Sequence, residues 1–344
     1  MKKLLFSAAV CSLFMISCNN EMESDLSNVD SKIATKAFVN NVDFQIVNYN
    51  GEDCFQFRND STYNETITKL AEMSNEEVDA FFSGFNFISQ QKLMEEADKE
   101  QEAIVDAYEK DPSQPWPYQQ IAEFKQKYDD VFMFNPYDST DFVANYKVQN
   151  PLYRNLANKQ GLFLIGDSVI NCSTYTLNNL FGSSITTYGD NIATGENNLN
   201  KAESKYQIPG GDYVKVRAIP TFIATEIISG KYYKQVGFDY LSQKKKVLWK
   251  KHHGRIHLRL TATGSGNIFE VYNITAKQFE NRYNQTFMLY VNVYDKLNAK
   301  DGMALGHVGQ SANSPEFFFR GDMEIWSDEI PESNKGKSKI DIPE

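Results

Sequence analysis

The chain has 344 residues, 41% of them hydrophobic, and carries a formal net charge of −10 at pH 7. A chain of this length can bury one large hydrophobic core or two moderate ones. Because the net charge is negative, phosphate groups would repel the protein, so general binding to nucleic acid or to an anionic lipid surface is excluded.

The first residues have the composition of a cleaved export signal. Lys2 and Lys3 precede an apolar stretch at 4–16, which is too short to span a bilayer, where ~20 residues are needed. The small residue Ser17 then precedes Cys18. This ending resembles the lipobox of bacterial lipoproteins, which implies that 1–17 is a signal peptide and that Cys18 carries the lipid. We therefore expect an outer-membrane lipoprotein of the cell envelope, held to the membrane through Cys18 and facing either the periplasm or the cell surface.

The mature chain is expected to begin with a tether and a helix-rich part. Residues 18–40 are polar and acidic, which is typical of a flexible tether with a reach of roughly 25 Å. Within 41–130, Asn50-Gly51 between two apolar runs predicts a β-hairpin. Two helix starts follow, with Ser61 as the cap of the first and a capping box at 74–77 for the second. A periodic apolar face predicts a third helix over 89–109, which the three prolines at 112–117 end. A short last helix carries Ile121, Phe124 and Tyr128.

From residue 131 onward, strand signals dominate, and 178–212 is expected to be a loop because it is rich in Asn, Gly, Ser and Thr. The pattern predicts an antiparallel sandwich or curled sheet over 131–328 and a frayed polar tail over 329–344. The fold class is therefore α+β, with a helical N-terminal part followed by a predominantly antiparallel β part. The predicted strands cover 162–165, 168–176, 214–216, 222–228, 232–238, 247–249, 255–263, 287–293 and 317–326.

Two cysteines remain after the signal and Cys18 are set aside. Cys54 and Cys172 both lie in predicted strands. In an oxidising compartment they could form one disulfide. Alternatively, both are small buried apolar residues.

The segment Gly166-Asp167-Ser168 follows a predicted strand and resembles the Gly-Asp-Ser block of the esterase and lipase superfamily. That resemblance implies a nucleophilic serine in a Ser-His-Asp triad. The family's late Asp-x-x-His pair is missing, because none of the four histidines has an aspartate three residues before it. A nucleophilic serine needs an oriented base. We therefore assign no catalytic residue and interpret Gly166-Asp167 as a hairpin turn, while a serine hydrolase built around Ser168 stays as the alternative function.

The histidines do not predict a metal site. His253 and His257 would lie some 13 Å apart on one face of a strand, too far to share a zinc ion. No metal and no cofactor are therefore expected.

A basic segment runs against the charge of the whole chain. Residues 231–259 hold nine Lys or Arg against one acid, whereas 61–110 hold twelve acids against four lysines. The segment could bind an acidic glycan. Alternatively, it is a solvated sheet face, or it meets the acidic helices charge to charge. The candidate residues of this anionic-ligand face are Lys244, Lys245, Lys246, Trp249, Lys250, Lys251, Arg255 and Arg259.

Three stretches resemble exported lipoproteins of unassigned function from gut Bacteroidota: the lipobox with its tether, the block from 55 to 85, and the turn and strand at 158–167. The resemblance implies placement in the envelope and a helical part before a strand-rich part, and it carries no activity. We therefore expect a non-enzymatic protein that binds a glycan, a peptide or an envelope protein.

Overall fold

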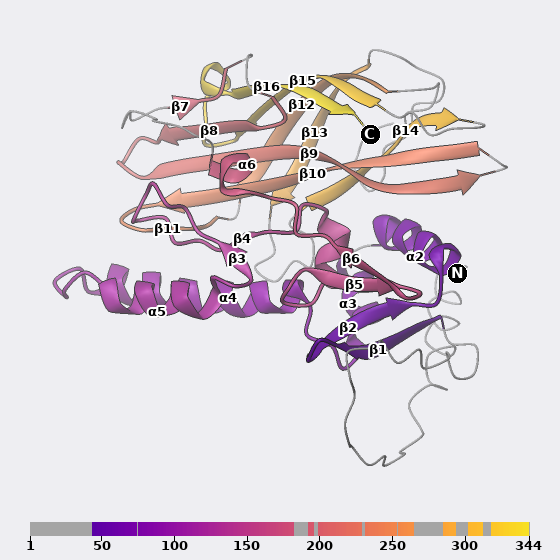
Figure 1. Ribbon diagram of the computed structural model, residues 1–344. Helices are drawn as coiled ribbons and strands as arrows, with labels where there is room; N and C mark the ends of the chain where they lie inside the picture. The colour runs from indigo at the N-terminus through magenta and orange to yellow at the C-terminus, as the bar shows by residue number, and fades with distance from the viewer. Residues whose placement is uncertain are drawn as a thin grey trace, which may run out of the picture.

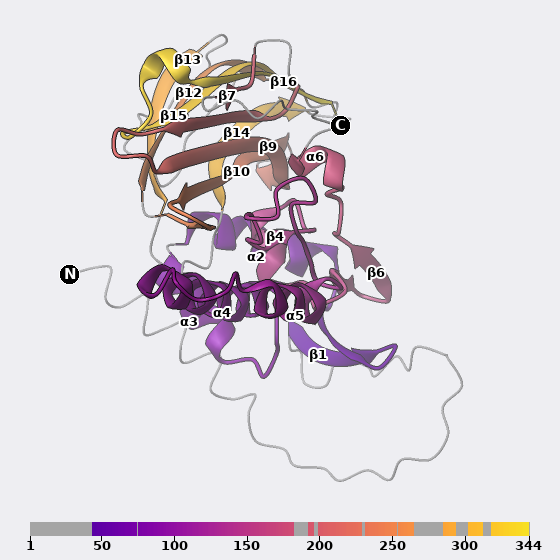
Figure 2. The same ribbon diagram turned by 90° about the vertical axis from the view of Figure 1, so that its left-hand side faces the viewer.

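The computed structural model describes residues 43–73, 75–181, 192–195, 199–228, 231–252, 254–264, 285–293, 302–311 and 318–343. Cys18 and the tether lie outside these residues. A β-sandwich forms one end of the molecule, helices lie beneath it, and a small sheet forms the other end (Figures 1 and 2). Among the helices that are described, none combines the length and the apolar character of a membrane span.

The small sheet has the strand order β1-β2-β5-β6. Its strands are β1 (Phe44–Tyr49), β2 (Glu52–Phe57), β5 (Leu162–Ile165) and β6 (Ser168–Asn171). Asn50 and Gly51, which join β1 to β2, have φ angles of 51° and 84°. Both are left-handed, as a type I′ turn requires. The predicted hairpin is confirmed.

Four helices follow the hairpin; the first two pack on this sheet, and the other two pack in a separate core with residues 131–146. They are α2 (Asp60–Glu72), α3 (Asn75–Ser83), α4 (Gln90–Lys110) and α5 (Tyr118–Tyr128). The helix predicted over 89–109 is confirmed as α4, and Ser89 caps it by accepting a hydrogen bond from the backbone N–H of Lys92. The predicted cap of α2 is wrong: Asn59, not Ser61, accepts from the N–H of Thr62 at 3.0 Å. Ser74 of the predicted capping box lies outside the described residues.

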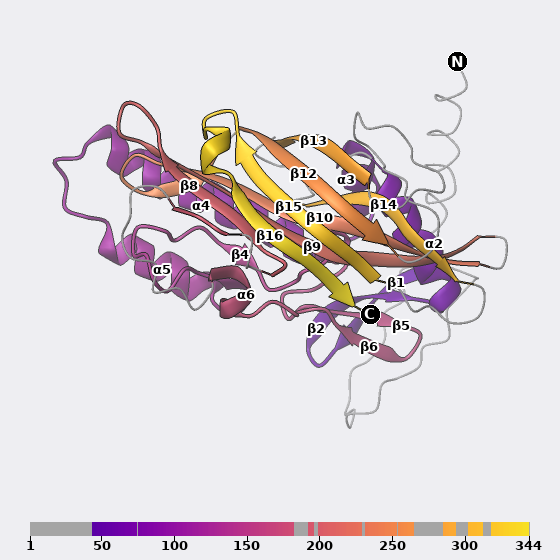
Figure 3. The same ribbon diagram turned by 90° about the horizontal axis from the view of Figure 1, so that it is seen from above.

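The sandwich consists of two antiparallel sheets, which agrees with the predicted α+β class. One has the order β11-β10-β9-β8-β7 with β14 added to β10, and the other has the order β13-β12-β15-β16. From above, β12, β15 and β16 lie in front of β9 and β10 (Figure 3). Apolar residues of both sheets alternate inward and fill the core between them. The strands are β7 (Ile192–Ala193), β8 (Ala202–Gln207), β9 (Tyr213–Ile228), β10 (Lys231–Lys245), β11 (Trp249–Lys251), β12 (Gly254–Gly264), β13 (Gln285–Val293), β14 (Gly302–Ser311), β15 (Phe318–Ser327) and β16 (Gly336–Pro343).

Two expectations about the C-terminal half are wrong. Residues 329–344 are not a frayed tail, because β16 pairs with β15 along its length. Ile340 is buried and Ile342 packs on the sandwich core. Every second residue at the end of β16 therefore faces the core, although the segment as a whole is polar. The stretch 178–212, expected to be a loop, contains α6 (Leu177–Phe181) in part and β7 and β8 entirely.

The helical part joins the sandwich on the outer face of the β7–β11 sheet. The connecting segment contains β3 (Phe132–Met133), β4 (Asn145–Tyr146) and the 3-10 helix η2 (Pro151–Asn155). The fully buried Arg154 of η2 pairs with Asp239 of β10 at 3.2 Å. Tyr175 donates to the same carboxylate at 3.1 Å. These contacts fix the sandwich relative to the helices.

Candidate functional site

Ser168 lies at the start of β6 and is exposed. The turn before it has Gly166 at φ 54°, and Ile165 pairs with Ser168 across a two-residue loop. Glycine at the first central position is the signature of a type II′ hairpin turn, so the turn interpretation is confirmed. The described histidine rings bond carboxylates elsewhere: His252 contacts Glu329 and His257 contacts Asp328, each at 2.5 Å. Within the described chain, Ser168 therefore has no oriented base.

Cys54 and Cys172 are free, buried thiols. Asn158 donates to Cys54 Sγ at 3.0 Å, and Cys172 Sγ donates to the carbonyl of Gly161 at 2.9 Å. Burial raises the pKa of Cys54 to about 11 and that of Cys172 to about 12. The disulfide that the sequence allows is not formed. Cys172 packs in the cluster with Phe55, whereas Cys54, next to Phe55 along β2, points to the opposite face.

The lysines of β11 meet the acidic helix α4 charge to charge. Lys251 pairs with Asp98 at 2.8 Å, and Lys250 pairs with Asp106 and Glu109 at 3.1 and 3.3 Å. Burial opposes the charge on Lys250, but these acids outweigh it and raise its pKa. For these two lysines, the structure shows the alternative in which the basic segment meets the acidic helices charge to charge.

The remaining residues of the predicted anionic-ligand face do not share one surface. Lys244 pairs with Glu329 at 3.0 Å at one end of the sandwich. Arg259 lies on the outer face of β12 and pairs with Glu324 and Glu332. Lys246 and Arg255 are exposed. The structure thus distributes the basic segment over several surfaces instead of forming one face.

Lys245 and Trp249 lie together in a second group, which we call the Trp249 cluster: Lys205, Lys215, Lys245, Tyr213, Trp249, Asp138 and Asp141. The ammonium groups of Lys215, Lys245 and Lys205 lie 4.6, 5.8 and 5.9 Å from the centre of the Trp249 ring. The buried indole donates to Asp138 at 3.0 Å. The sequence interpretation missed Lys205 and Lys215, although the alternation Val214-Lys215-Val216-Arg217 places Lys215 on the polar face of a strand.

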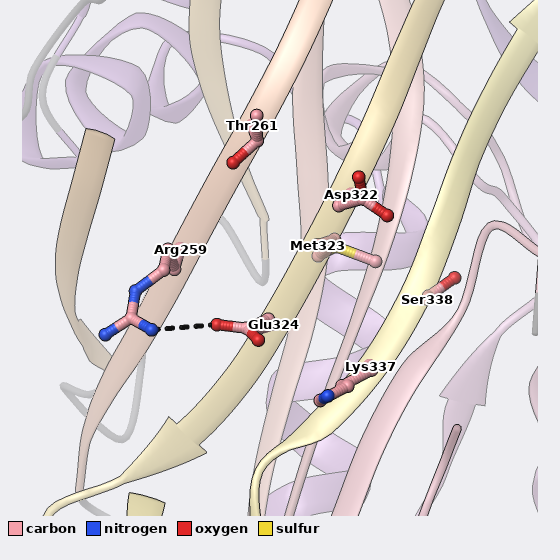
Figure 4. Close-up of a pocket in the computed structure, with 7 residues that line it drawn as sticks. All are labelled: Arg259, Thr261, Asp322, Met323, Glu324, Lys337 and Ser338. Atoms are coloured by element: carbon pink, nitrogen blue, oxygen red, sulfur yellow. Dashed lines mark hydrogen bonds and ion pairs between the residues drawn. The ribbon is translucent and has the colours of Figure 1, made fainter. Parts of the chain in front are cut away.

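A shallow hollow of about 280 Å³ lies on the outer face of the second sheet. Figure 4 shows its lining on three neighbouring strands. Arg259, Glu324 and Lys337 stand opposite one another in one row, because Arg259 pairs with Glu324 and Glu324 with Lys337 across the strands. Thr261 and Asp322 form the next row. Met323 and Ser338 complete the lining.

His257 and Trp326 stand opposite each other in the row next to that of Arg259 and Glu324. Their rings stack at 5.2 Å with an angle of 10°. The guanidinium of Arg259 lies 5.2 Å from the Trp326 ring. The Arg259 side chain is therefore in contact with the Trp326 ring as well as with its two carboxylates. In the hollow and in the rest of the described residues, no group of three His, Cys, Asp or Glu side chains could hold a metal ion.

Together these features define an α+β protein with a two-sheet sandwich and an open polar site. The family model described as "Domain of unknown function (DUF4848)" matches residues 46–266, and the chain belongs to this family. A solved DUF4848 family protein (BT3222) from Bacteroides thetaiotaomicron VPI-5482 is 23% identical, with 87% of this chain and 100% of that chain covered and a TM-score of 0.35. No curated protein matches the chain.

Proposed function

We propose that this protein is a lipid-anchored cell-envelope protein that binds a neutral glycan, without converting it, through the hollow on the β12, β15 and β16 strands. Of the ligand classes that the sequence allows, a glycan fits the hollow best. The anchor is Cys18, which follows the lipobox-like end of the signal.

The observation that carries the proposal is the balance of charge in the hollow. Arg259 and Lys337 stand against Asp322 and Glu324, and Thr261 adds a hydroxyl. Neighbouring strands lie ~4.8 Å apart, so donors and acceptors alternate at short, fixed intervals. A sugar hydroxyl both donates and accepts hydrogen bonds. A neutral ligand with several hydroxyls matches this lining, whereas an ionic ligand would be attracted by one half of it and repelled by the other.

The position of the hollow supports the same function. The described chain begins next to β1, at the end of the molecule opposite the β12, β15 and β16 strands (Figure 1). A tether from Cys18 reaches roughly 25 Å. A protein held in this way would present the hollow away from the membrane, toward a soluble or polymeric ligand.

The test is a glycan array followed by a calorimetric titration of the best neutral glycan. Asp322→Asn replaces an accepting carboxylate oxygen by an amide donor and Thr261→Val removes a hydroxyl, both with little change of shape, and Lys246→Gln is the control on a different surface. Each lost hydrogen bond should weaken binding by about tenfold or less, and the two changes together by more. Binding that is equal in all variants, or absent from the array, would refute the proposed site.

A further inference from the structure

The connection between α4 and α5 carries three aromatic side chains, which we call the Trp116 cluster: Tyr108, Trp116 and Tyr118. This connection lies at one end of the molecule, beyond the edge of the sandwich (Figures 1 and 3). The Trp116 ring lies 5.4 Å from the Tyr108 ring at an angle of 69°, and 6.1 Å from the Tyr118 ring at 52°. Tyr118 is 75% exposed, and the other two are half-buried. Neighbouring aromatic rings therefore reach solvent together.

The chain holds the Trp116 cluster in place before any ligand arrives. Pro115 and Pro117 restrict the backbone on both sides of Trp116, and the N–H of Tyr118 donates to the carbonyl of Trp116 at 2.8 Å. Tyr108 and Trp116 also pack against the hydrophobic core of α4 and α5. Side chains held in this way lose little conformational entropy on binding.

The polar groups at the edges of the three rings are not used by the rest of the described chain. No hydrogen bond links the indole N–H of Trp116, or the hydroxyls of Tyr108 and Tyr118, to another described residue. When another molecule covers Tyr or Trp, these groups usually find a hydrogen-bond partner. Each ring thus combines an apolar surface with a polar group that a ligand can use.

The charges beside the Trp116 cluster favour neither an anion nor a cation. Asp111 accepts hydrogen bonds from the backbone N–H and the hydroxyl of Ser113, so the turn itself uses this carboxylate. Glu109 pairs with Lys250. The exposed Lys110 precedes Asp111 and carries the opposite charge. A ligand without net charge therefore fits this surface best.

The exposed area of the Trp116 cluster is small for a protein partner. Each aromatic side chain covers about 150–250 Å² and two of the three are half-buried, so together they expose roughly 300 Å² at most. Each partner in a stable protein interface buries about 800 Å². A sugar ring is smaller: its C–H groups form an apolar face that packs on an aromatic ring, and its hydroxyls bond the polar groups at the ring edge.

We propose that the Trp116 cluster binds a neutral glycan through the stacking of sugar rings on Trp116 and Tyr118. This site shares no residue with the hollow on β12, β15 and β16. It is therefore a second binding site, and its test is independent of the test of the proposed function.

The experiment measures how far a neutral glycan protects Trp116 from quenching by acrylamide. The probes are cellohexaose, maltohexaose and laminarihexaose, and the protein is the mature chain with Cys18→Ser in place of the lipid. The chain has three tryptophans; Trp249 and Trp326 are 1% and 7% exposed, so acrylamide quenches mainly Trp116. We expect at least one probe to reduce quenching in the wild type, and Trp116→Phe to abolish this effect.

Variants of Tyr118 test the stacking itself. Tyr118→Ala should weaken the binding of that probe about three- to tenfold, whereas Tyr118→Phe, which keeps the ring, should weaken it less. Tyr137→Ala is the matched control, because Tyr137 is also exposed, at 55%, and lies outside the Trp116 cluster. Asp322→Asn and Thr261→Val in the hollow should leave the protection of Trp116 unchanged, which separates the two sites.

Several results would overturn the proposal. These are the absence of protection by all three probes, protection that persists in Trp116→Phe, and wild-type binding by Tyr118→Ala. Tyr118→Ala should keep the wild-type Tm within about 2 °C; a larger fall would mean that the ring serves the fold. A wild-type dimer that Tyr118→Ala dissociates in sedimentation would mean that the rings contact a second copy of the chain instead of a glycan.

Discussion

Arg154 is expected to contribute strongly to the free energy of unfolding, because it connects the helices to the sandwich. Its side chain is fully buried, pairs with Asp239, and lies 4.0 Å from the Tyr146 ring centre. Removing one partner of such a pair leaves an uncompensated buried charge. We predict that Arg154→Leu lowers the free energy of unfolding by about 3–5 kcal/mol. Arg320→Leu, which breaks the exposed pair with Asp341, should cost less than about 1 kcal/mol in the same urea titration.

The two thiols offer a separate test at the scale of the residue. Because the pKa of Cys54 is about 11 and that of Cys172 about 12, both are protonated at neutral pH, and the thiol is a poor nucleophile. We predict that a thiol reagent leaves both unmodified in the folded protein and modifies both in denaturant without a reducing agent. A denatured protein that shows no reactive thiol would mean that the two cysteines form a disulfide after all.

Glu329 should make stability depend on pH. Burial alone would raise its pKa, but hydrogen bonds from Lys244 and His252 outweigh burial and lower the pKa below its ordinary value of 4.5. A carboxyl whose pKa is lower in the folded state stabilises the protein above about pH 4.5, and this contribution is lost as the pH falls through the folded pKa. We predict that Glu329→Gln costs about 0.5–1 kcal/mol at pH 7. The cost should shrink in urea titrations at lower pH; a cost that does not change with pH would contradict this explanation.

At the scale of the element, the helices were more predictable than the strands. Ser89 and the apolar period after it define α4, and Ile121, Phe124 and Tyr128 are all buried in α5, because helix signals are local in sequence. Strand β8 reads Ala202-Glu203-Ser204-Lys205-Tyr206-Gln207, and its polar composition resembles a loop. Which of its side chains face the core depends on its contacts with β9 and β16, which are distant in sequence, so the sequence of β8 alone does not predict it.

The contact between α4 and β11 depends on charge and can be tested as a pair. Lys251 and Asp98 are both largely buried, so reversing one charge places two like charges in contact. We predict that Lys251→Glu lowers the free energy of unfolding by about 1–2 kcal/mol and that adding Asp98→Lys restores at least half of the loss. Urea titrations of both single variants and the double variant measure the coupling; effects that simply add would mean that the pair does not hold the helix.

At the scale of the whole molecule, the candidate sites were predictable only in part. The basic segment contains Lys245, Trp249 and Arg259, which the structure places in two separate groups. The segment does not include Lys205 and Lys215, which lie near Trp249, or Asp322 and Glu324, which lie on the strand beside Arg259. These residues come together only through the register of β8, β9 and β15. The sequence interpretation grouped Lys250 and Lys251 with a ligand face, although the acids of α4, over 140 residues earlier, pair with them.

Anchoring is a property of the whole molecule, and we propose that Cys18 determines it. Two or more acyl chains hold a protein stably on a membrane, whereas one chain is marginal. We predict that Cys18→Ala moves the protein from the membrane fraction to the soluble fraction, whereas Cys11→Ala leaves it in the membrane fraction. Retention of the Cys18 variant on membranes after a high-salt wash would contradict the lipid anchor.

The most direct test of the proposed function is one titration of the best neutral glycan at low and high salt, about 0.05 and 0.5 M, with wild type and Asp322→Asn in parallel. A neutral ligand held by hydrogen bonds in a charge-balanced hollow should bind the wild type with nearly the same Kd at both salt concentrations, because screening has little net charge to act on. Asp322→Asn should weaken binding equally at both. Binding that falls steeply with salt, or that Asp322→Asn leaves unchanged, would contradict the account.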